Sequence, residues 1–184
     1  MPPVTDEQLV ARINAGHHPA AGQAFEALYR RHRDYVLHVT TRFAHGDTHL
    51  ALDAMQDTFT TLLRQFPGFT LTAKLTTYLY PVAKNATHAA ARQRRRTPTN
   101  ADAPLPSVPA PQAPDNPAAD PTQLDHLLAP LSPEHREVVL LRFVDDMPLA
   151  DIATALDLPL GTVKSRLHHA LTKLREHPAT KNFF

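Results

Sequence analysis

The chain has 184 residues, 42% hydrophobic and 20% charged, a length and balance that suit one globular domain or two small ones. It contains no cysteine, which excludes a disulfide framework, a thiolate metal site and a cysteine nucleophile. It shows neither an apolar run long enough to span a membrane nor a secretory signal, so we expect a cytoplasmic protein.

The net charge of +1 conceals an uneven distribution. Residues 1–96 carry 12 Lys and Arg against 7 Asp and Glu, whereas residues 97–126 carry 4 acidic residues and no basic one. The basic half ends in four arginines: Arg92, Arg94, Arg95 and Arg96. Such a cluster suits nucleic-acid phosphates, and it also suits the negative pole of a helix dipole, so both interpretations stay open.

Helical periodicity dominates the first 96 residues, where apolar residues recur mostly three or four positions apart. Gly16 and Gly46 interrupt the pattern. A third segment runs from about 50 to 66 and is ended by Pro67 and Gly68, and a fourth runs from about 75 to 96. Because no stretch alternates convincingly at period two, we predict an all-α fold.

A composition change separates two parts of the chain. Residues 97–121 hold eight prolines, no aromatic residue and no basic residue, and they cannot bury enough apolar surface to offset the entropy of ordering. We therefore predict a disordered, Pro/Ala-rich linker at 97–121, between small helical domains at 5–96 and 122–177.

Limited proteolysis should cut first between Thr97 and Pro121, because this segment is expected to have little to pack against. Stable fragments from both sides should appear on a denaturing gel. Digestion of the flanking domains before this segment would contradict the two-domain interpretation.

The C-terminal part shows a helix-turn-helix pattern. Ser132 can cap a helix that starts with Pro133 and runs to about Phe143. A short helix follows at 149–156, a break at 157–161 and a last helix at about 162–176. Two helices joined by a tight turn that contains a glycine, here Gly161, are typical of helix-turn-helix proteins.

The last helix has one apolar face, formed by Val163, Leu167, Ala170, Leu171 and Leu174. The polar residues on or beside the opposite face are Lys164, Ser165, His168, His169 and Thr172. Such side chains can reach base edges in the major groove, although an ordinary solvated face is the alternative.

The runs Leu131–Phe143, Ile152–Ala153 and Pro159–Ala170 closely resemble region 4 of extracytoplasmic-function (ECF) sigma factors, most specifically from Gly161 to Arg166. The resemblance covers nearly all of residues 127–176 and implies binding to the minus 35 promoter element. It assigns this contact to Thr162, Lys164, Ser165, Arg166, His168 and His169. Response-regulator activators carry a similar motif, so a stand-alone helix-turn-helix regulator is the alternative function.

The run Ala51–Phe59 resembles the region 2 stretch that faces the clamp helices of bacterial RNA polymerase. Asp53, Gln56 and Asp57 lie at i, i+3 and i+4 and should share one helix face. The resemblance implies that they bind polymerase, and simple solvation is the alternative. Because acidic groups are poor phosphate ligands, we expect this face to be separate from the arginine cluster.

The run Leu75–Asn85 resembles the region 2.3 to 2.4 helix, in which the family commonly has Trp at the position of Tyr78 and Arg at that of Pro81. The resemblance implies minus 10 recognition with a base flipped from the melted strand. The implied residues are Tyr78, Tyr80, Lys84, Asn85, Arg92, Arg94, Arg95 and Arg96. Tyr78 as a core aromatic is the alternative, and Pro81 should kink or restart the helix at a cost of about 3 kcal/mol.

Twelve histidines raise the question of a metal site. His45 and His49 flank an apparent turn, and the adjacent His168 and His169 point apart on a helix, so we expect no metal and no cofactor. No catalytic constellation stands out either. We therefore predict an ECF-type sigma factor, not an enzyme, with core RNA polymerase and promoter DNA as partners and an anti-sigma factor as a further candidate. A His-rich metallohydrolase is the remaining, weaker alternative.

Overall fold

The computed structural model describes residues 4–16, 18–96 and 121–177, which form eight helices and no strand. The all-α prediction is therefore confirmed for the described part of the chain. Two compact units, residues 1–111 and 112–184, divide the protein. The predicted linker at 97–121 lies, up to residue 120, outside the described residues.

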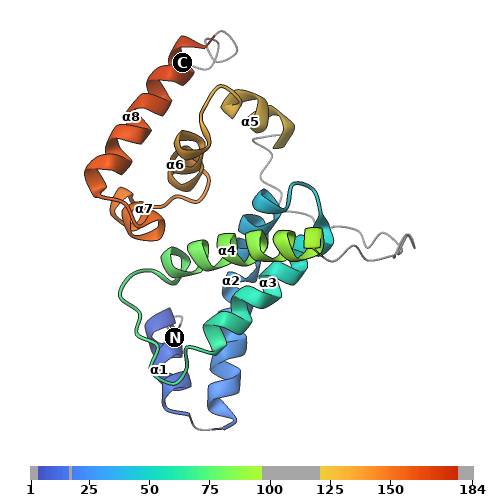
Figure 1. The fold of residues 1–184 in the computed structure, drawn as a ribbon. Coiled ribbons are helices and arrows are strands. Elements are labelled where there is room, and N and C mark those ends of the chain that lie inside the picture. Colours follow the sequence, from blue (N-terminus) through green and yellow to red (C-terminus); the bar gives the residue numbers. More distant parts are fainter. Residues whose placement is uncertain (1–3, 17, 97–120, 178–184) are drawn as a thin grey trace. The chain divides into compact units, whose positions relative to one another are not determined.

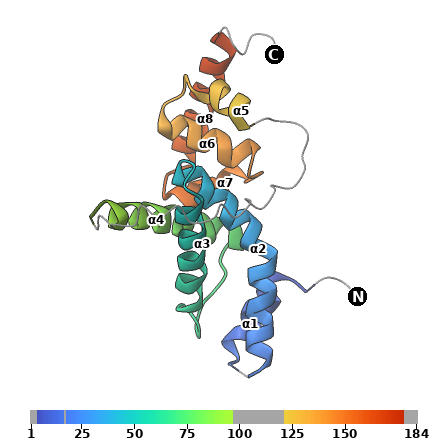
Figure 2. The same cartoon turned by 90° about the vertical axis from the view of Figure 1, so that its right-hand side faces the viewer.

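The first unit is built around one long helix. Its four helices are α1 (Asp6–Asn14), α2 (Ala20–Ala44), α3 (Thr48–Leu63) and α4 (Leu75–Arg96). Helix α2 contacts the other three, and α3 packs against α4 (Figures 1 and 2). The largest fully buried side chains include Leu28, Val36, Leu62, Leu79 and Tyr80, which place the core of this unit among α2, α3 and α4.

Local sequence explains the tight connection between α2 and α3. His45 ends α2 in the left-handed conformation at φ 50°, and Gly46 follows at φ +88°, a backbone geometry that glycine adopts without steric cost. The Asp47 carboxylate then accepts a hydrogen bond from the Leu50 N–H at 2.8 Å and so caps α3. The predicted break at Gly46 is thereby confirmed.

The sequence predicts a kink or a restart of the helix at Pro81; α4 continues through this residue as one helix, so the restart does not occur. Pro81 lacks the N–H that would bond to the Thr77 carbonyl, at a cost of about 3 kcal/mol. Leu79, Tyr80 and Ala83 around it are fully buried. Burial of large apolar side chains contributes about 1.5–3 kcal/mol each, so tertiary packing outweighs the local defect.

The second unit contains α5 (Pro121–Leu128), α6 (Pro133–Phe143), α7 (Leu149–Leu156) and α8 (Leu160–Glu176). Ser132 caps α6 by accepting from the His135 N–H, as its place before Pro133 predicts. The core of this unit joins α5, α6 and α8 through Leu128, Leu131, Val139, Ala170 and Leu174.

The turn between α7 and α8 differs from the prediction. Asp157, at φ 52°, is the left-handed residue that ends α7, and the Leu158 N–H closes the turn on the Ala153 carbonyl at 2.9 Å. Gly161 lies in the first turn of α8 instead of in the connection. Because Asp tolerates the left-handed conformation better than most residues, the turn needs no glycine.

Within the described ranges, no helix combines the length and the apolar composition that crossing a membrane requires.

Candidate functional site

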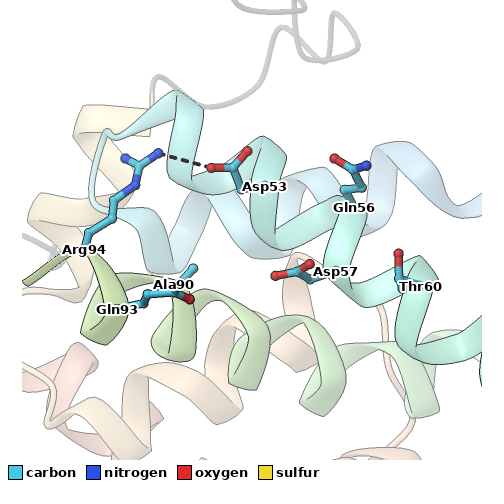
Figure 3. Close-up of a pocket in the computed structure, with 7 residues that line it drawn as sticks. All are labelled: Asp53, Gln56, Asp57, Thr60, Ala90, Gln93 and Arg94. Atoms are coloured by element: carbon cyan, nitrogen blue, oxygen red, sulfur yellow. Dashed lines mark hydrogen bonds and ion pairs between the residues drawn. The ribbon is translucent and has the colours of Figure 1, made fainter. Parts of the chain in front are cut away.

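An open groove of about 510 Å³ runs between α3 and α4 (Figure 3). Asp53, Gln56 and Asp57 lie on the exposed face of α3 and line the groove together with Thr60, whereas Phe59 and Leu62 face the core. The wall formed by α4 consists of Ala90, Gln93 and Arg94. The structure thus brings the three predicted polymerase-binding residues onto one accessible surface, which we call the acidic groove.

Arg94 belongs to the acidic groove, contrary to its predicted place on a separate DNA-binding face. Its Nη1 lies 2.6 Å from Asp47 Oδ2, and its Nη2 lies 3.2 Å from Asp53 Oδ2. Because α4 packs along α3, the C-terminal end of α4 lies beside the N-terminal half of α3. The expectation of two separate faces is therefore wrong at this residue.

Asp47 joins the two helices, because it caps α3 and also binds Arg94. Burial alone would raise the pKa of Asp47, but the hydrogen bonds from the Leu50 N–H and the Arg94 guanidinium lower it below its ordinary value of 3.8. The ionised Asp47 carboxylate therefore stabilises the fold at any pH above about 3.8. This stabilisation is lost as the pH falls through the lowered pKa.

Asp47→Ala should reduce the free energy of unfolding by about 1 kcal/mol, because it removes the helix cap. Asp47→Asn should cost less, since Asn caps helices as well as Asp and only an exposed ion pair is lost. Urea unfolding at neutral pH, followed by circular dichroism, measures both. Equal losses from Ala and Asn would show that the cap contributes nothing.

Arg92, Arg95 and Arg96 differ from Arg94. All three are exposed, and none forms an ion pair with another described residue. Their guanidinium groups are therefore accessible to an external anion such as a phosphate.

Tyr78 lies half-buried at the edge of an aromatic cluster in the α3–α4 connection. The centroids of the Tyr78 and Phe69 rings are 4.9 Å apart in a T-shaped arrangement, and those of Phe69 and Phe66 are 5.4 Å apart. Burial raises the pKa of the Tyr78 phenol. Tyr78 therefore packs on the protein without being a fully enclosed core residue. Its burial lies between the two alternatives that its sequence position suggested, a core aromatic and a base-stacking surface residue.

Asn14, at the end of α1, holds the connection that carries this cluster. Its Nδ2 donates to the Phe69 carbonyl at 2.8 Å, and its Oδ1 accepts from the Gly68 N–H at 2.7 Å. Sequence reasoning missed Asn14 and Phe69 as supports of Tyr78. Phe66 and Phe69, on either side of Pro67 and Gly68, could have predicted the aromatic cluster. No local sequence feature predicts that Asn14 binds this connection.

Tyr80, also predicted to contact the minus 10 element, is fully buried, and its ring packs on Phe43 at 6.2 Å. Its ring is therefore part of the core and cannot stack on a base in this conformation. The Lys84 ammonium lies over the Phe43 ring at 5.6 Å, and Asn85 is exposed. Lys84 and Asn85 thus remain at the surface, one turn beyond Tyr80.

The polar face of α8 is accessible as its periodicity predicts. Lys164, Ser165, His168 and His169 are exposed, Thr162 and Arg166 are half-buried, and Val163, Ala170 and Leu174 are buried in the core of the second unit. A three-residue turn joins α7 and α8, which is the connection length of a helix-turn-helix.

His135 extends this polar face onto α6. Its ring lies 6.4 Å from that of His169, which in turn lies 5.7 Å from that of His168. Beside it, the pKa of Glu134 is lowered by hydrogen bonds from its own backbone N–H and from Ser132, with a smaller contribution from Arg166. Sequence reasoning missed His135, because only the packing of α6 on α8 brings it next to His169.

The histidines do not form a metal site in the part of the chain that the structure describes, since no group of three or more His, Cys, Asp or Glu is suitably placed there.

Comparison with known proteins identifies similar sequences over both units. Residues 28–97 match the family Sigma-70 region 2, and residues 127–176 match the family Sigma-70, region 4. The RNA polymerase sigma factor CarQ of Myxococcus xanthus is 31% identical over 159 residues, which cover 85% of this chain and 90% of CarQ. The ECF RNA polymerase sigma factor SigL of Mycobacterium tuberculosis is 31% identical over 169 residues, which cover 90% and 94% of the two chains.

Two solved structures share the fold. CnrH, in complex with the cytosolic domain of CnrY, superposes with a TM-score of 0.63 at 21% identity, over 92% of this chain and 94% of CnrH. The sigma factor RpoE of Bartonella quintana, in complex with the anti-sigma factor NepR, has a TM-score of 0.60 at 21% identity, over 83% and 94% of the two chains.

Proposed function

The chain belongs to the ECF sigma factors of RNA polymerase, and from this premise we propose which of its surfaces bind polymerase and which bind promoter DNA. Its function is promoter-directed transcription initiation. We place region 2 at residues 5–96 and region 4 at residues 122–177, with the segment 97–121 as the linker. The combination of an acidic groove in one unit and an exposed helix-turn-helix face in the other supports this assignment.

Core RNA polymerase binds at the acidic groove in this proposal. Asp53, Gln56 and Asp57 supply two carboxylates and one amide from consecutive turns of α3, all of them exposed. Carboxylates in this arrangement accept hydrogen bonds from arginine or lysine side chains of a partner. The groove is therefore suited to a basic protein surface and unsuited to nucleic acid.

The minus 10 element binds along α4. Tyr78 can stack on an unpaired base, because its ring is held by a T-shaped contact with Phe69 while part of the side chain stays accessible. Lys84 and Asn85 offer donors one to two turns further on, and Arg92, Arg95 and Arg96 suit the phosphates. Tyr80 supports this surface from the core and takes no direct part.

The minus 35 element binds at the start of α8. Lys164, Ser165, His168 and His169 are placed to reach base edges, and Thr162 and Arg166 lie beside them, closer to the core. His135 of α6 is an additional donor at the edge of the same surface.

Transcription with purified components tests the function. The chain, core polymerase and a promoter template captured from the native genome should together produce transcripts from one defined start site, and omission of the chain should abolish them. A stand-alone regulator would bind promoter DNA without restoring specific initiation to core polymerase. The matches to sigma factors over both units do not favour that alternative.

We further propose that the chain acts in the cytoplasm, contributes no catalytic step of its own and is controlled by an anti-sigma factor. The last proposal draws on the similar fold of RpoE, which was solved with the anti-sigma factor NepR. Affinity purification of the chain from its host, followed by mass spectrometry of the bound proteins, should recover core polymerase subunits and one small additional protein.

A further inference from the structure

Arg94 stands apart from its neighbours in the arginine cluster, because it alone forms ion pairs with other described residues. It is held by two carboxylates, Asp47 at 2.6 Å and Asp53 at 3.2 Å. Figure 3 shows its guanidinium at one end of the acidic groove, pointing toward Asp53. One cation of a proposed DNA-binding cluster thus occupies a proposed polymerase-binding surface.

These contacts are exchangeable. The Arg94 side chain is 45% exposed and that of Asp53 is 64% exposed, and ion pairs with this degree of solvation are weak. Another cation can therefore replace Arg94 on Asp53, and a phosphate can replace Asp53 on Arg94. Rotation about the side-chain bonds of Arg94 moves the guanidinium without a change in α4.

The two proposed partners favour the exchange in the same direction. A basic polymerase side chain that binds Asp53 competes with Arg94 for the same carboxylate, and Arg94 then keeps only Asp47. DNA placed along Arg92, Arg95 and Arg96 brings phosphates close to the neighbouring Arg94. Each partner therefore lowers the cost of binding the other, which is the definition of positive coupling between two sites.

We propose that Arg94 is an exchangeable cation: in the free chain Asp47 and Asp53 hold it and disfavour its contact with DNA, and docking of core polymerase on Asp53 leaves only the exposed pair with Asp47, which a promoter phosphate then replaces. The proposal rests on the assignment of the acidic groove to polymerase and of the arginine cluster to DNA. A permanent clamp between α3 and α4, with no part in DNA binding, is the competing explanation for the same contacts.

Salt dependence of DNA binding separates the two explanations. The logarithm of the DNA-binding constant falls linearly with the logarithm of the salt concentration, and each phosphate neutralised by a cation makes this slope steeper by about 0.9. Arg94→Gln and the matched variant Arg95→Gln are compared in the free chain and in the holoenzyme. In the free chain, Arg95→Gln should make the slope less steep by about 0.9, and Arg94→Gln should change it by clearly less. In the holoenzyme, the complex of the chain with core polymerase, both variants should make the slope less steep by about 0.9.

A second set of variants releases Arg94 without polymerase. The double variant Asp47→Asn with Asp53→Asn keeps a capping residue at the start of α3 but removes both carboxylates. It should steepen the slope of the free chain by about 0.9, and this gain should vanish when Arg94→Gln is added. Asp57→Asn, on the same groove but without an ion pair to Arg94, should leave the slope unchanged.

Equal slopes for Arg94→Gln and Arg95→Gln in the free chain would overturn the withholding of Arg94. An unchanged slope for Arg94→Gln in the holoenzyme would overturn its release and identify it as a clamp. If Arg95→Gln has no effect in either state, the assignment of the arginine cluster to DNA fails instead, which is a failure of the proposed function.

Discussion

Asp57→Lys should abolish the co-elution of the chain with core RNA polymerase in size-exclusion chromatography. Asp57 lines the acidic groove, is exposed and forms no ion pair with another described residue. Reversal of its charge should therefore weaken the binding of polymerase without changing the stability of the fold. A like charge placed against a basic partner surface costs several kcal/mol, which corresponds to at least about a hundredfold loss of affinity.

The same variant should bind DNA no more weakly than the unchanged chain, because it removes a negative charge. Asp57→Asn should lose less polymerase affinity than Asp57→Lys. Asp34→Lys, on the exposed side of α2, is the charge-reversal control; it loses only an exposed ion pair with the neighbouring Arg33, and it should co-elute normally. Asp53 is a less direct test, since its reversal also breaks the contact with Arg94. Normal co-elution of Asp57→Lys would refute the assignment of this face of α3 to polymerase.

Replacement of Lys164, His168 and His169 by Ala should remove the footprint of the holoenzyme over the minus 35 element. Each lost base contact costs about 1–3 kcal/mol, so affinity for the minus 35 element should fall at least about fivefold even if only one of the three side chains reaches a base. The fold should be unaffected, because these side chains are exposed while Val163, Ala170 and Leu174 form the buried face of α8.

Arg175→Ala controls for the loss of positive charge in the triple variant. It removes one exposed positive charge from the same helix, but about 16 Å further along the axis, away from the end that enters a groove. It should leave the footprint intact, and both proteins should melt at the same temperature by circular dichroism. An unchanged footprint for the triple variant would mean that another surface reads the upstream element.

Local signals in the sequence were sufficient for the ends of α4, α6 and α7 but did not predict α5. Ser132 and Pro133 mark the start of α6, Pro67 and Gly68 lie in the connection after α3, and α4 has its predicted bounds at 75 and 96. Caps, glycines and a periodicity of three to four residues act between neighbours in the chain. The same holds for the accessible face of α8 and for the shared face of Asp53, Gln56 and Asp57.

Tertiary packing decided the rest. Burial of Leu79 and Tyr80 carried α4 through Pro81 and removed Tyr80 from the DNA-binding surface. Helix α6 supplied His135, and α1 supplied Asn14. Above all, Arg94 and Asp53 are 41 positions apart in the chain, and only the packing of α4 along α3 places them 3.2 Å from each other. The sequence by itself therefore determined the fold class, the family and which face of each helix is polar. The partners of those polar residues depend on distances between helices, which local propensity and periodicity do not encode.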